Sequence, residues 1–452
     1  MESWQLGVAE IAAQVRGRQL SPVEAVTALL SRSAALDPQI QAWATLDAEG
    51  ALLAARALEA RVGRGEDVGL LGGVPIGLKD IFYTKGLRTS GGSRALADFI
   101  PDEDATSVAR LRRAGAVILG KLHTAEFASA DPPPTRNAWD QAHTPGGSSS
   151  GSGAAVAAGM VPAATGSQTG GSTLRPAAYN GIVGLKPTYG LISCTGVIAL
   201  AWSLDHVGVI ARSVQDAALL LEAMAGYDPR DAASVRRRRV VYSQEAHPPA
   251  SPPRLGLVRD YFLERCEPDI RRHTEEVAQR LARAGAQVEE VRLPHSFSRI
   301  HEDHGVIMTA EAAGYHEARF KEKSHLYGPK IAQRVREGLA MSAATYARTL
   351  HNRPALVAEL EKTVAQADAL LTPATPAPAP RDLTTTGDAS FQSPWSYAGL
   401  PAIALPSGVN QAGLPLGIQL IAGRWRDARL LQVARWCEMA LDFRAHPSCW
   451  SR

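Results

Sequence analysis

Apolar positions recur along the first part of the chain at both helical and strand spacing. Near the start, the capping sequence Ser21-Pro22-Val23-Glu24 opens one predicted helix, and residues 51–62 form a second. Apolar runs at 74–78 and 116–119 predict two buried strands, with an amphipathic helix at 104–114 between them. This alternation of strand and helix indicates an α/β fold.

The alternation continues in the second half of the chain. The predicted elements are a β-α-β unit at 254–258, 268–284 and 287–293, mostly helical chain at 300–370, strands at 402–406 and 416–421, and a final helix from Asp427. The sequence has no internal repeat. We therefore predict one large α/β body.

Composition narrows the possible classes of protein. Of 452 residues 45% are hydrophobic and 21% are charged, and the formal net charge is +3, which excludes a disordered chain and gives no footprint for nucleic acid or a membrane surface. The run of four arginines at 236–239 is interpreted as a solvated loop. Four widely spaced cysteines form no metal or redox pair, and no secretory leader or run of about 18 apolar residues occurs. These features predict a cytoplasmic protein.

Two segments are unusually rich in glycine and serine. Residues 146–153 contain only Gly and Ser, and residues 166–172 are again small and polar. Such density is typical of flexible linkers. Here the two segments flank an Ala/Val segment inside the hydrophobic part of the chain, which favours close approach of the backbone to another group.

Three familiar motifs are only partly matched. Residues 115–121 fit a phosphate loop as far as its lysine but lack the following Ser or Thr. His301 and His304 have no zinc-site context and are expected at the surface. The segment 147–151 fits G-x-S-x-G without the strand that a nucleophile elbow needs, so an α/β-hydrolase stays only an alternative.

Three segments together carry a more specific signal. They read Gly77-Leu78-Lys79-Asp80, then PGGSSSGSG at 145–153, then GSQTGGSTLRP at 166–176. In this order they resemble the amidase signature family of Ser–cis-Ser–Lys hydrolases, and further matching segments extend over most of the chain. The resemblance implies a central twisted mixed β-sheet flanked by helices. It also implies one domain over 1–452, with N-terminal helices at about 1–65, a catalytic core at about 66–225, a helical and β-α-β elaboration at about 250–370, and a closing segment at about 371–452.

The resemblance assigns a role to three residues. Ser172 becomes the nucleophile, Ser148 a bridging serine after a cis peptide bond, and Lys79 the base. A serine hydroxyl needs an acceptor for its proton, and a lysine amine can accept one only when neutral. The apolar run before Lys79 is expected to bury the amine and lower its pKa. The structural alternatives are a strand-end lysine paired with Asp80, a turn serine at 148 and a capping serine at 172.

The same resemblance implies the rest of the site. Backbone N–H groups of Thr169, Gly170 and Gly171 would form the oxyanion hole. No metal or cofactor is expected. The rival Lys186 is interpreted as structural, and Ser149 and Ser150 as loop residues that bind backbone. Aromatic side chains that could either wall a pocket or pack in the core are Trp139, Trp202, Phe391, Trp395 and Tyr397.

Two positions depart from the family pattern. Many relatives have aspartate where Gln168 stands, and the glutamine-using amidotransferase subunit has glutamine where Pro176 stands. The leading function is therefore hydrolysis of amide, ester or carbamate bonds of a small molecule, including aryl amides and urethanes. The alternative is a glutamine-hydrolysing amidotransferase subunit of a multi-subunit complex. A homodimer is left open, and a binding protein with a vestigial site is the third class.

Overall fold

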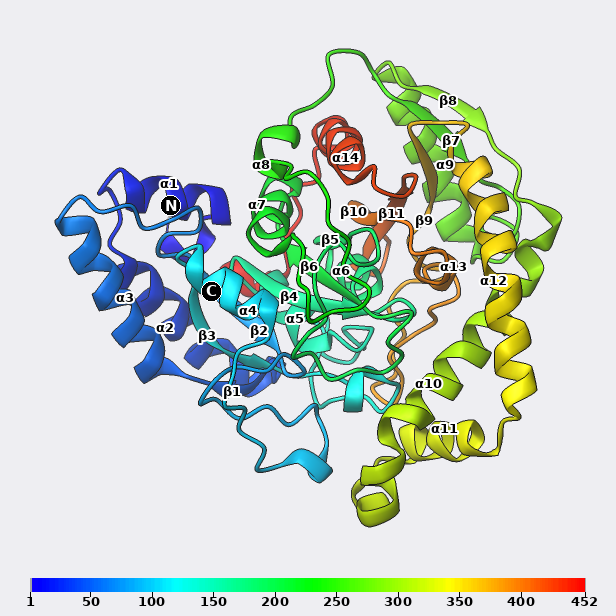
Figure 1. Ribbon diagram of the computed structural model, residues 1–452. Coiled ribbons are helices and arrows are strands. Elements are labelled where there is room, and N and C mark those ends of the chain that lie inside the picture. The colour runs from blue at the N-terminus through cyan, green and yellow to red at the C-terminus, as the bar shows by residue number, and fades with distance from the viewer. Residues whose placement is uncertain (1, 452) are drawn as a thin grey trace.

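The computed structural model describes residues 2–451, and its centre is one sheet of eleven strands (Figure 1). In chain order the strands are β1 (Trp43–Leu46), β2 (Pro75–Lys79), β3 (Val117–Leu122), β4 (Ala163–Gln168), β5 (Val183–Lys186), β6 (His206–Ala211), β7 (Arg254–Leu257), β8 (Gln287–Glu290), β9 (Ala369–Pro373), β10 (Ala402–Val409) and β11 (Pro415–Ile421). Their order across the sheet is β1-β3-β2-β4-β6-β5-β10-β11-β9-β7-β8. Strand β2 is parallel to both β3 and β4, whereas β6 is antiparallel to β4 and β5. The sheet is therefore mixed.

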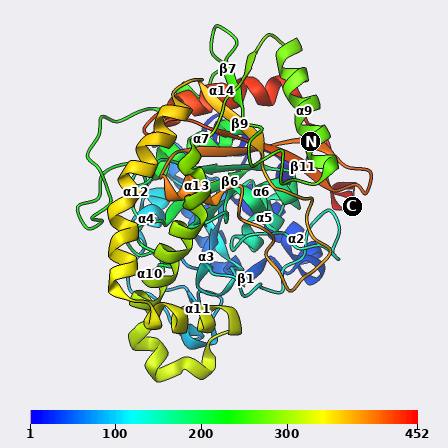
Figure 2. The ribbon, with the colours of Figure 1, turned by 90° about the vertical axis from the view of Figure 1, so that its right-hand side faces the viewer.

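Helices cover the sheet and extend beyond both of its ends (Figures 1 and 2). They are α1 (Val8–Arg16), α2 (Pro22–Ile40), α3 (Ala48–Gly63), α4 (Thr106–Arg113), α5 (Ser150–Ala157), α6 (Leu174–Asn180), α7 (Val214–Met224), α8 (Tyr242–Glu245), α9 (Pro268–Arg283), α10 (Ile300–Lys323), α11 (Pro329–Ala340), α12 (Ala343–Val364), α13 (Ser393–Tyr397) and α14 (Asp427–Leu441). The N-terminal helices α1–α3 lie at one side of the molecule, and α10–α12 lie at the other. This arrangement confirms the predicted α/β body with a mixed sheet flanked by helices.

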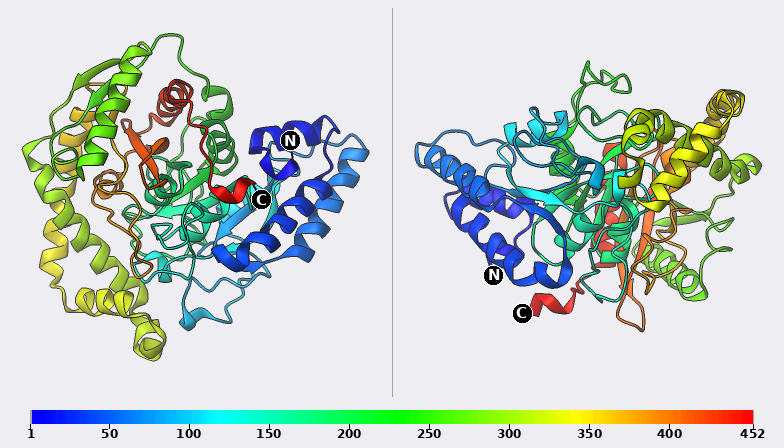
Figure 3. Two further views of the ribbon diagram at one scale, coloured as in Figure 1. Left: turned by 180° about the vertical axis from the view of Figure 1, so that it is seen from behind. Right: turned by 90° about the horizontal axis from the view of Figure 1, so that it is seen from below.

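The two chain ends meet on one side of the molecule (Figure 3). The rings of Trp4 and Trp450 pack edge to face with centroids 5.1 Å apart, and the Trp450 indole N–H donates to the carbonyl of Ala157. These contacts join the C-terminal segment to the segment before α1 and to the end of α5. Within residues 2–451, none of the helices combines the length and apolar character needed to span a membrane.

The strands that the hydrophobic pattern predicts are present, but five of the eleven strands were not predicted. They are β1 at one edge of the sheet and β4, β5, β6 and β9 inside it. Every residue of β4 is buried, yet the strand reads Ala-Ala-Thr-Gly-Ser-Gln and lacks the large β-branched or aromatic residues that mark strands. Its small side chains fit because β2 and β6 pair with it on either side. Both Gly/Ser-rich segments are buried except for the half-buried Gly170, as the close-approach interpretation predicted.

Candidate active site

Lys79 ends β2, which lies between β3 and β4 in the sheet. Every residue of β2 is buried, and the Lys79 side chain has no solvent exposure. Its Nζ lies 2.6 Å from Ser148 Oγ and 2.7 Å from Ser167 Oγ. A neutral amine has two hydrogens and one lone pair, so it can donate to one hydroxyl and accept from the other. The structure therefore brings Lys79 and Ser148 together as predicted, and adds Ser167.

Ser148 stands in a sharp turn that two glycines make. Gly146 and Gly147 have φ angles of +82° and +63°, in the left-handed region where a side chain is strained. A Cβ on Gly147 would lie 2.7 Å from Pro176 Cδ and 3.1 Å from Ser172 Cα, so only glycine fits there. The prediction of a cis peptide bond before Ser148 is wrong, because no peptide bond within residues 2–451 is cis. The paired glycines turn the chain without one.

Ser172 lies between β4 and α6 and is 7% exposed. Its Oγ accepts a hydrogen bond of 3.0 Å from the backbone N–H of Ser148. Among the described residues, no hydrogen bond joins the two hydroxyl groups of Ser148 and Ser172. The structure therefore brings Ser172, Ser148 and Lys79 into one connected cluster, in which the hydroxyl–hydroxyl link is not made.

Burial lowers the pKa of Lys79 well below its usual value of 10.5. The carboxylate of Asp205 opposes this shift, and burial is the larger effect. Burial also raises the pKa of Asp205 to about 6, against the hydrogen bond that it accepts from the Thr169 hydroxyl at 2.5 Å. The physical cause is the expected one, since an amine without solvent favours its neutral form. No neighbouring cation is needed.

The predicted oxyanion loop passes directly before Ser172. Within residues 2–451, the backbone N–H groups of the three predicted donors Thr169, Gly170 and Gly171 have no hydrogen-bond acceptor, and neither has that of Ser172. Unpaired N–H groups beside a serine hydroxyl are what an oxyanion hole requires. Gly170 is half-buried, so the cluster meets solvent at this loop.

Gln168 occupies the position where aspartate was expected from the family pattern. Its Oε1 accepts hydrogen bonds of 3.0 Å from the backbone N–H groups of both Thr173 and Leu174, at the start of α6. The uncharged side chain therefore binds neighbouring backbone, as predicted. Ser149 and Ser150 also bond to backbone, through the carbonyls of Ser167 and Gly147.

His304 is not at the surface, which corrects the sequence-based expectation. It lies on α10, is 5% exposed, and its Nε2 is 2.9 Å from the carbonyl oxygen of Thr169. His301 is half-buried and stacks on the Tyr261 ring at 4.9 Å. Nothing in the chain near His304 indicates its neighbour, because 135 residues separate it from Thr169.

Sequence reasoning missed three more residues of this region: Ser167, Asp205 and Ser396. Ser167 could have been found, since Thr165 and Ser167 alternate along β4 and therefore point to the same side. The Lys79 N–H donates to the Thr165 hydroxyl, which confirms that this side faces β2. Asp205 and Ser396 come from distant loops and carry no local signal.

The aromatic residues considered as pocket walls mostly pack elsewhere. Phe391, Trp395 and Tyr397 have no solvent exposure, and Trp395 stacks on Phe262 with centroids 5.7 Å apart. Trp202 is 50% exposed. Lys186 is fully buried with its Nζ against the carbonyls of Leu400 and Pro187, as a structural lysine would be.

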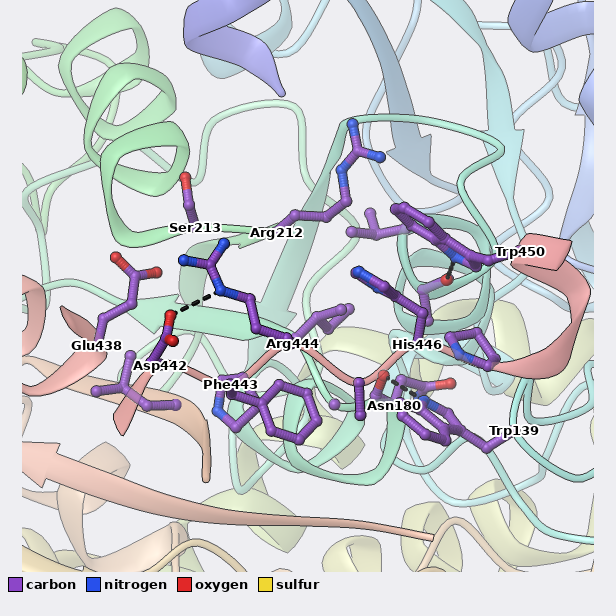
Figure 4. A pocket seen from close by; sticks show the side chains of 18 of the residues that line it. Trp139, Asn180, Arg212, Ser213, Glu438, Asp442, Phe443, Arg444, His446 and Trp450 are labelled. Carbon is purple, nitrogen blue, oxygen red and sulfur yellow. Dashed lines mark hydrogen bonds and ion pairs between the residues drawn. The ribbon is translucent and has the colours of Figure 1, made fainter. Parts of the chain in front are cut away.

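A separate pocket of about 530 Å³ lies near the C-terminal segment and contains none of the three cluster residues (Figure 4). Its charged groups are already engaged. Arg444 pairs with Asp442 at 2.7 Å, Arg435 pairs with Glu438, and the Trp139 indole donates to the Asn180 carbonyl. This pocket is therefore separate from the Lys79 cluster.

Comparisons with known proteins agree with this geometry. A family profile described as Amidase matches residues 24–431. The chain is 38% identical to a subunit of the glutamyl-tRNA(Gln) amidotransferase of Geobacter metallireducens, over 97% of this chain and 98% of that protein. The solved peptide amidase of Stenotrophomonas maltophilia is 32% identical, with a TM-score of 0.86 over 98% of both chains. A chain solved with a vestigial protein complex, from work on the origins of an s-triazine catabolic enzyme, is 30% identical with a TM-score of 0.91 over 98% of this chain and 100% of that chain.

Proposed function

Because the chain belongs to the amidase signature family, we propose that it hydrolyses amide bonds through an acyl intermediate on Ser172. The observation that carries the proposal is the buried Lys79 amine, which lies 2.6 Å from Ser148 Oγ. The backbone N–H of Ser148 in turn donates a hydrogen bond to Ser172 Oγ. A desolvated neutral amine next to two serines is suited to activate a nucleophile at neutral pH.

The first half of the reaction forms the acyl-enzyme. Ser172 Oγ attacks the amide carbonyl carbon, its proton passes to Ser148 Oγ, and the Ser148 proton passes to Lys79 Nζ. The negative charge on the substrate oxygen is met by the unpaired N–H groups of the loop at Gly170 and Gly171. When the C–N bond breaks, the proton returns through Ser148 to the leaving nitrogen, and an amine or ammonia departs.

The second half releases the acid. Water attacks the acyl carbon, the same two residues take its proton, and the C–O bond to Ser172 breaks as Ser172 regains a proton. Transfer between Ser172 and Ser148 requires their hydroxyls to meet. Catalytic hydrogen bonds of this kind often form only with substrate bound, so we expect this link in the substrate complex.

The names of the relatives favour the amidotransferase candidate, in which glutamine would be the substrate. The matched relatives that are named as glutamyl-tRNA(Gln) amidotransferase subunits correspond to this chain over almost their whole length. This supports the amidotransferase alternative over the aryl amide and urethane interpretation, for which the comparisons give no support. Pro176 and the similarity to a peptide amidase favour the second candidate, a free-standing amidase.

Ammonia release separates the two candidates. The purified chain, alone and co-expressed with the amidotransferase partner subunits of its own organism, is assayed with glutamine, peptide amides, an anilide and a carbamate. Glutamine hydrolysis that requires the partners supports the amidotransferase role. Turnover of peptide amides or anilides by the single chain supports the free-standing amidase, and carbamate turnover alone would return the urethanase interpretation. No acyl transfer under any condition contradicts the proposed reaction.

Activity is expected to fall as the pH is lowered through the depressed pKa of Lys79. A protonated Lys79 cannot accept the relayed proton, so kcat/KM should fall about tenfold per pH unit below its lowered pKa. The measurement is kcat/KM against pH with a substrate that does not titrate, and enzyme returned to neutral pH controls for unfolding. A profile that stays flat down to the pH at which the enzyme unfolds would contradict a lysine base that titrates.

A further inference from the structure

Two carbonyl groups of the oxyanion loop are hydrogen-bonded from outside the loop. The carbonyl of Thr169 lies 2.9 Å from His304 Nε2, and the carbonyl of Gly170 accepts a 2.8 Å bond from Ser396 Oγ. His304 is on α10 and Ser396 is on α13, so both partners come from the last third of the chain. Neither residue belongs to the Gly/Ser segments that contain Ser148 and Ser172.

These two bonds determine the direction of the N–H groups beside Ser172. In a trans peptide the C=O of one residue and the N–H of the next point in opposite directions. The Thr169 carbonyl and the Gly170 N–H belong to one peptide group, on which His304 acts. The Gly170 carbonyl and the Gly171 N–H belong to the next peptide group, on which Ser396 acts. Both N–H groups therefore point away from His304 and Ser396. They are two of the loop donors without a protein acceptor among residues 2–451.

Gln168 determines which way the Ser396 hydroxyl points. The backbone N–H groups of Thr173 and Leu174 both require an acceptor, so the oxygen of the Gln168 amide must face them and its nitrogen must face away. That nitrogen donates to Ser396 Oγ at 3.0 Å. With its oxygen accepting from Gln168, the single hydrogen of Ser396 is left for the Gly170 carbonyl.

Burial makes this arrangement rigid. Gln168 and Ser396 have no solvent exposure, and His304 is 5% exposed, so water has little access to these three side chains. Burial lowers the pKa of His304 to about 4, which leaves a neutral ring with one N–H at neutral pH. The Thr169 carbonyl can only accept, so that N–H is on Nε2.

We propose that Ser396 and His304 are positioning residues that hold the Gly170 and Gly171 N–H groups toward the oxyanion, with Gln168 fixing the direction of the Ser396 hydroxyl. This inference rests on the proposed acyl transfer at Ser172. It explains the departure from aspartate at position 168. A carboxylate there would accept from Ser396, whereas the glutamine amide donates to it.

The first test compares Ser396→Ala, Ser396→Thr and the control Thr274→Val. Thr274 is a buried hydroxyl of α9 that also donates to a backbone carbonyl at 2.8 Å, remote from the loop. We expect Ser396→Ala to lower kcat and the rate of fluorophosphonate labelling of Ser172 by about 10- to 100-fold with KM unchanged. Ser396→Thr keeps a hydroxyl and should restore most of the loss. Thr274→Val should lower only the melting temperature.

A purely structural role for Ser396 would give a different pattern. Ser396→Ala would then lower the melting temperature as Thr274→Val does, and kcat would stay within about twofold of wild type. That result would overturn the inference. If instead the wild-type enzyme is neither labelled at Ser172 nor releases amine from any substrate, the proposed function fails. The wild-type enzyme alone shows this, so failure of the proposed function is distinguishable from failure of the inference about Ser396.

The second test uses Gln168→Glu, which keeps the length of the side chain. The carboxylate can still accept from Thr173 and Leu174, but it turns the Ser396 hydrogen away from the Gly170 carbonyl. Gln168→Glu and Ser396→Ala then remove the same interaction, so the double variant should lose no more activity than the worse single variant. If the losses of the two single variants multiply in the double variant, Gln168 does not act through Ser396, and the inference is contradicted.

Discussion

Replacing Ser172 with alanine is expected to lower kcat by at least about 10⁴-fold, because the proposed acyl intermediate forms on its hydroxyl. Loss of a nucleophile removes the covalent route entirely and leaves only the contribution of the oxyanion donors and of binding. Ser172 is buried and makes its hydrogen bond with the Ser148 backbone, so the fold should survive the change. The measurements are kcat on the best substrate and the mass of the fluorophosphonate adduct.

Ser149→Ala is the matched control for this prediction. Ser149 is equally buried and neighbours Ser148, but its hydroxyl contacts only the backbone of Ser167. We expect the Ser149 variant to keep an adduct at Ser172, and the Ser172 variant to lose the adduct. An adduct on Ser149, or full activity of Ser172→Ala, would show that the nucleophile has been misassigned.

Lys79→Met should lower kcat by about 10²- to 10⁴-fold, the usual contribution of a general base. The same change should raise the stability of the folded state. Each unit by which burial lowers the pKa of Lys79 costs the fold about 1.4 kcal/mol, and methionine is buried without that cost. Ser148 and Ser167 lose one partner each, which offsets part of the gain.

The stability gain has a defined pH dependence. Between the lowered pKa of folded Lys79 and its usual value of 10.5, the unfolded chain binds the extra proton, so wild-type stability rises with pH. The advantage of Lys79→Met should therefore shrink from neutral to alkaline pH. The measurement is denaturant unfolding of both proteins across that range.

Lys186→Met is the control, since Lys186 is also fully buried with a pKa that burial lowers to about 7. Its amine bonds the carbonyls of Leu400 and Pro187, which would lose their donor. We expect Lys186→Met to keep activity and gain less stability than Lys79→Met. Activity retained by Lys79→Met, or lost only in Lys186→Met, would place the base at the other lysine.

The site segments could be recognised from the sequence because their chemistry is local. Lys79 follows an apolar run that predicts a buried strand, and β3 and β4 pair with that strand on its two sides. The glycines at 146 and 147 directly precede Ser148, and those at 170 and 171 directly precede Ser172. Each short segment therefore contains both the turn-forming glycines and the serine of the site. Strand β4 escaped prediction because small residues carry no hydrophobic period, although its neighbours bury it completely.

The partners of the oxyanion loop could not be predicted from the sequence. His304 was predicted at the surface because the residues around it in the sequence do not indicate a contact with Thr169. The two residues that share this hydrogen bond are 135 positions apart. The same holds for Ser396, which is 226 residues from Gly170. Only packing of α10 and α13 against the loop brings these side chains to its carbonyls.

The sequence by itself determined the fold class, the family and the three residues that meet at the end of β2, because each depends on neighbouring residues or on a short motif. The tertiary structure decided that Ser148 follows a trans bond, that Ser167 shares the amine of Lys79, and that Asp205, His304 and Ser396 surround the loop. Those features depend on contacts between segments distant in the chain. Such contacts are set by how the elements pack, and no short stretch of sequence records them.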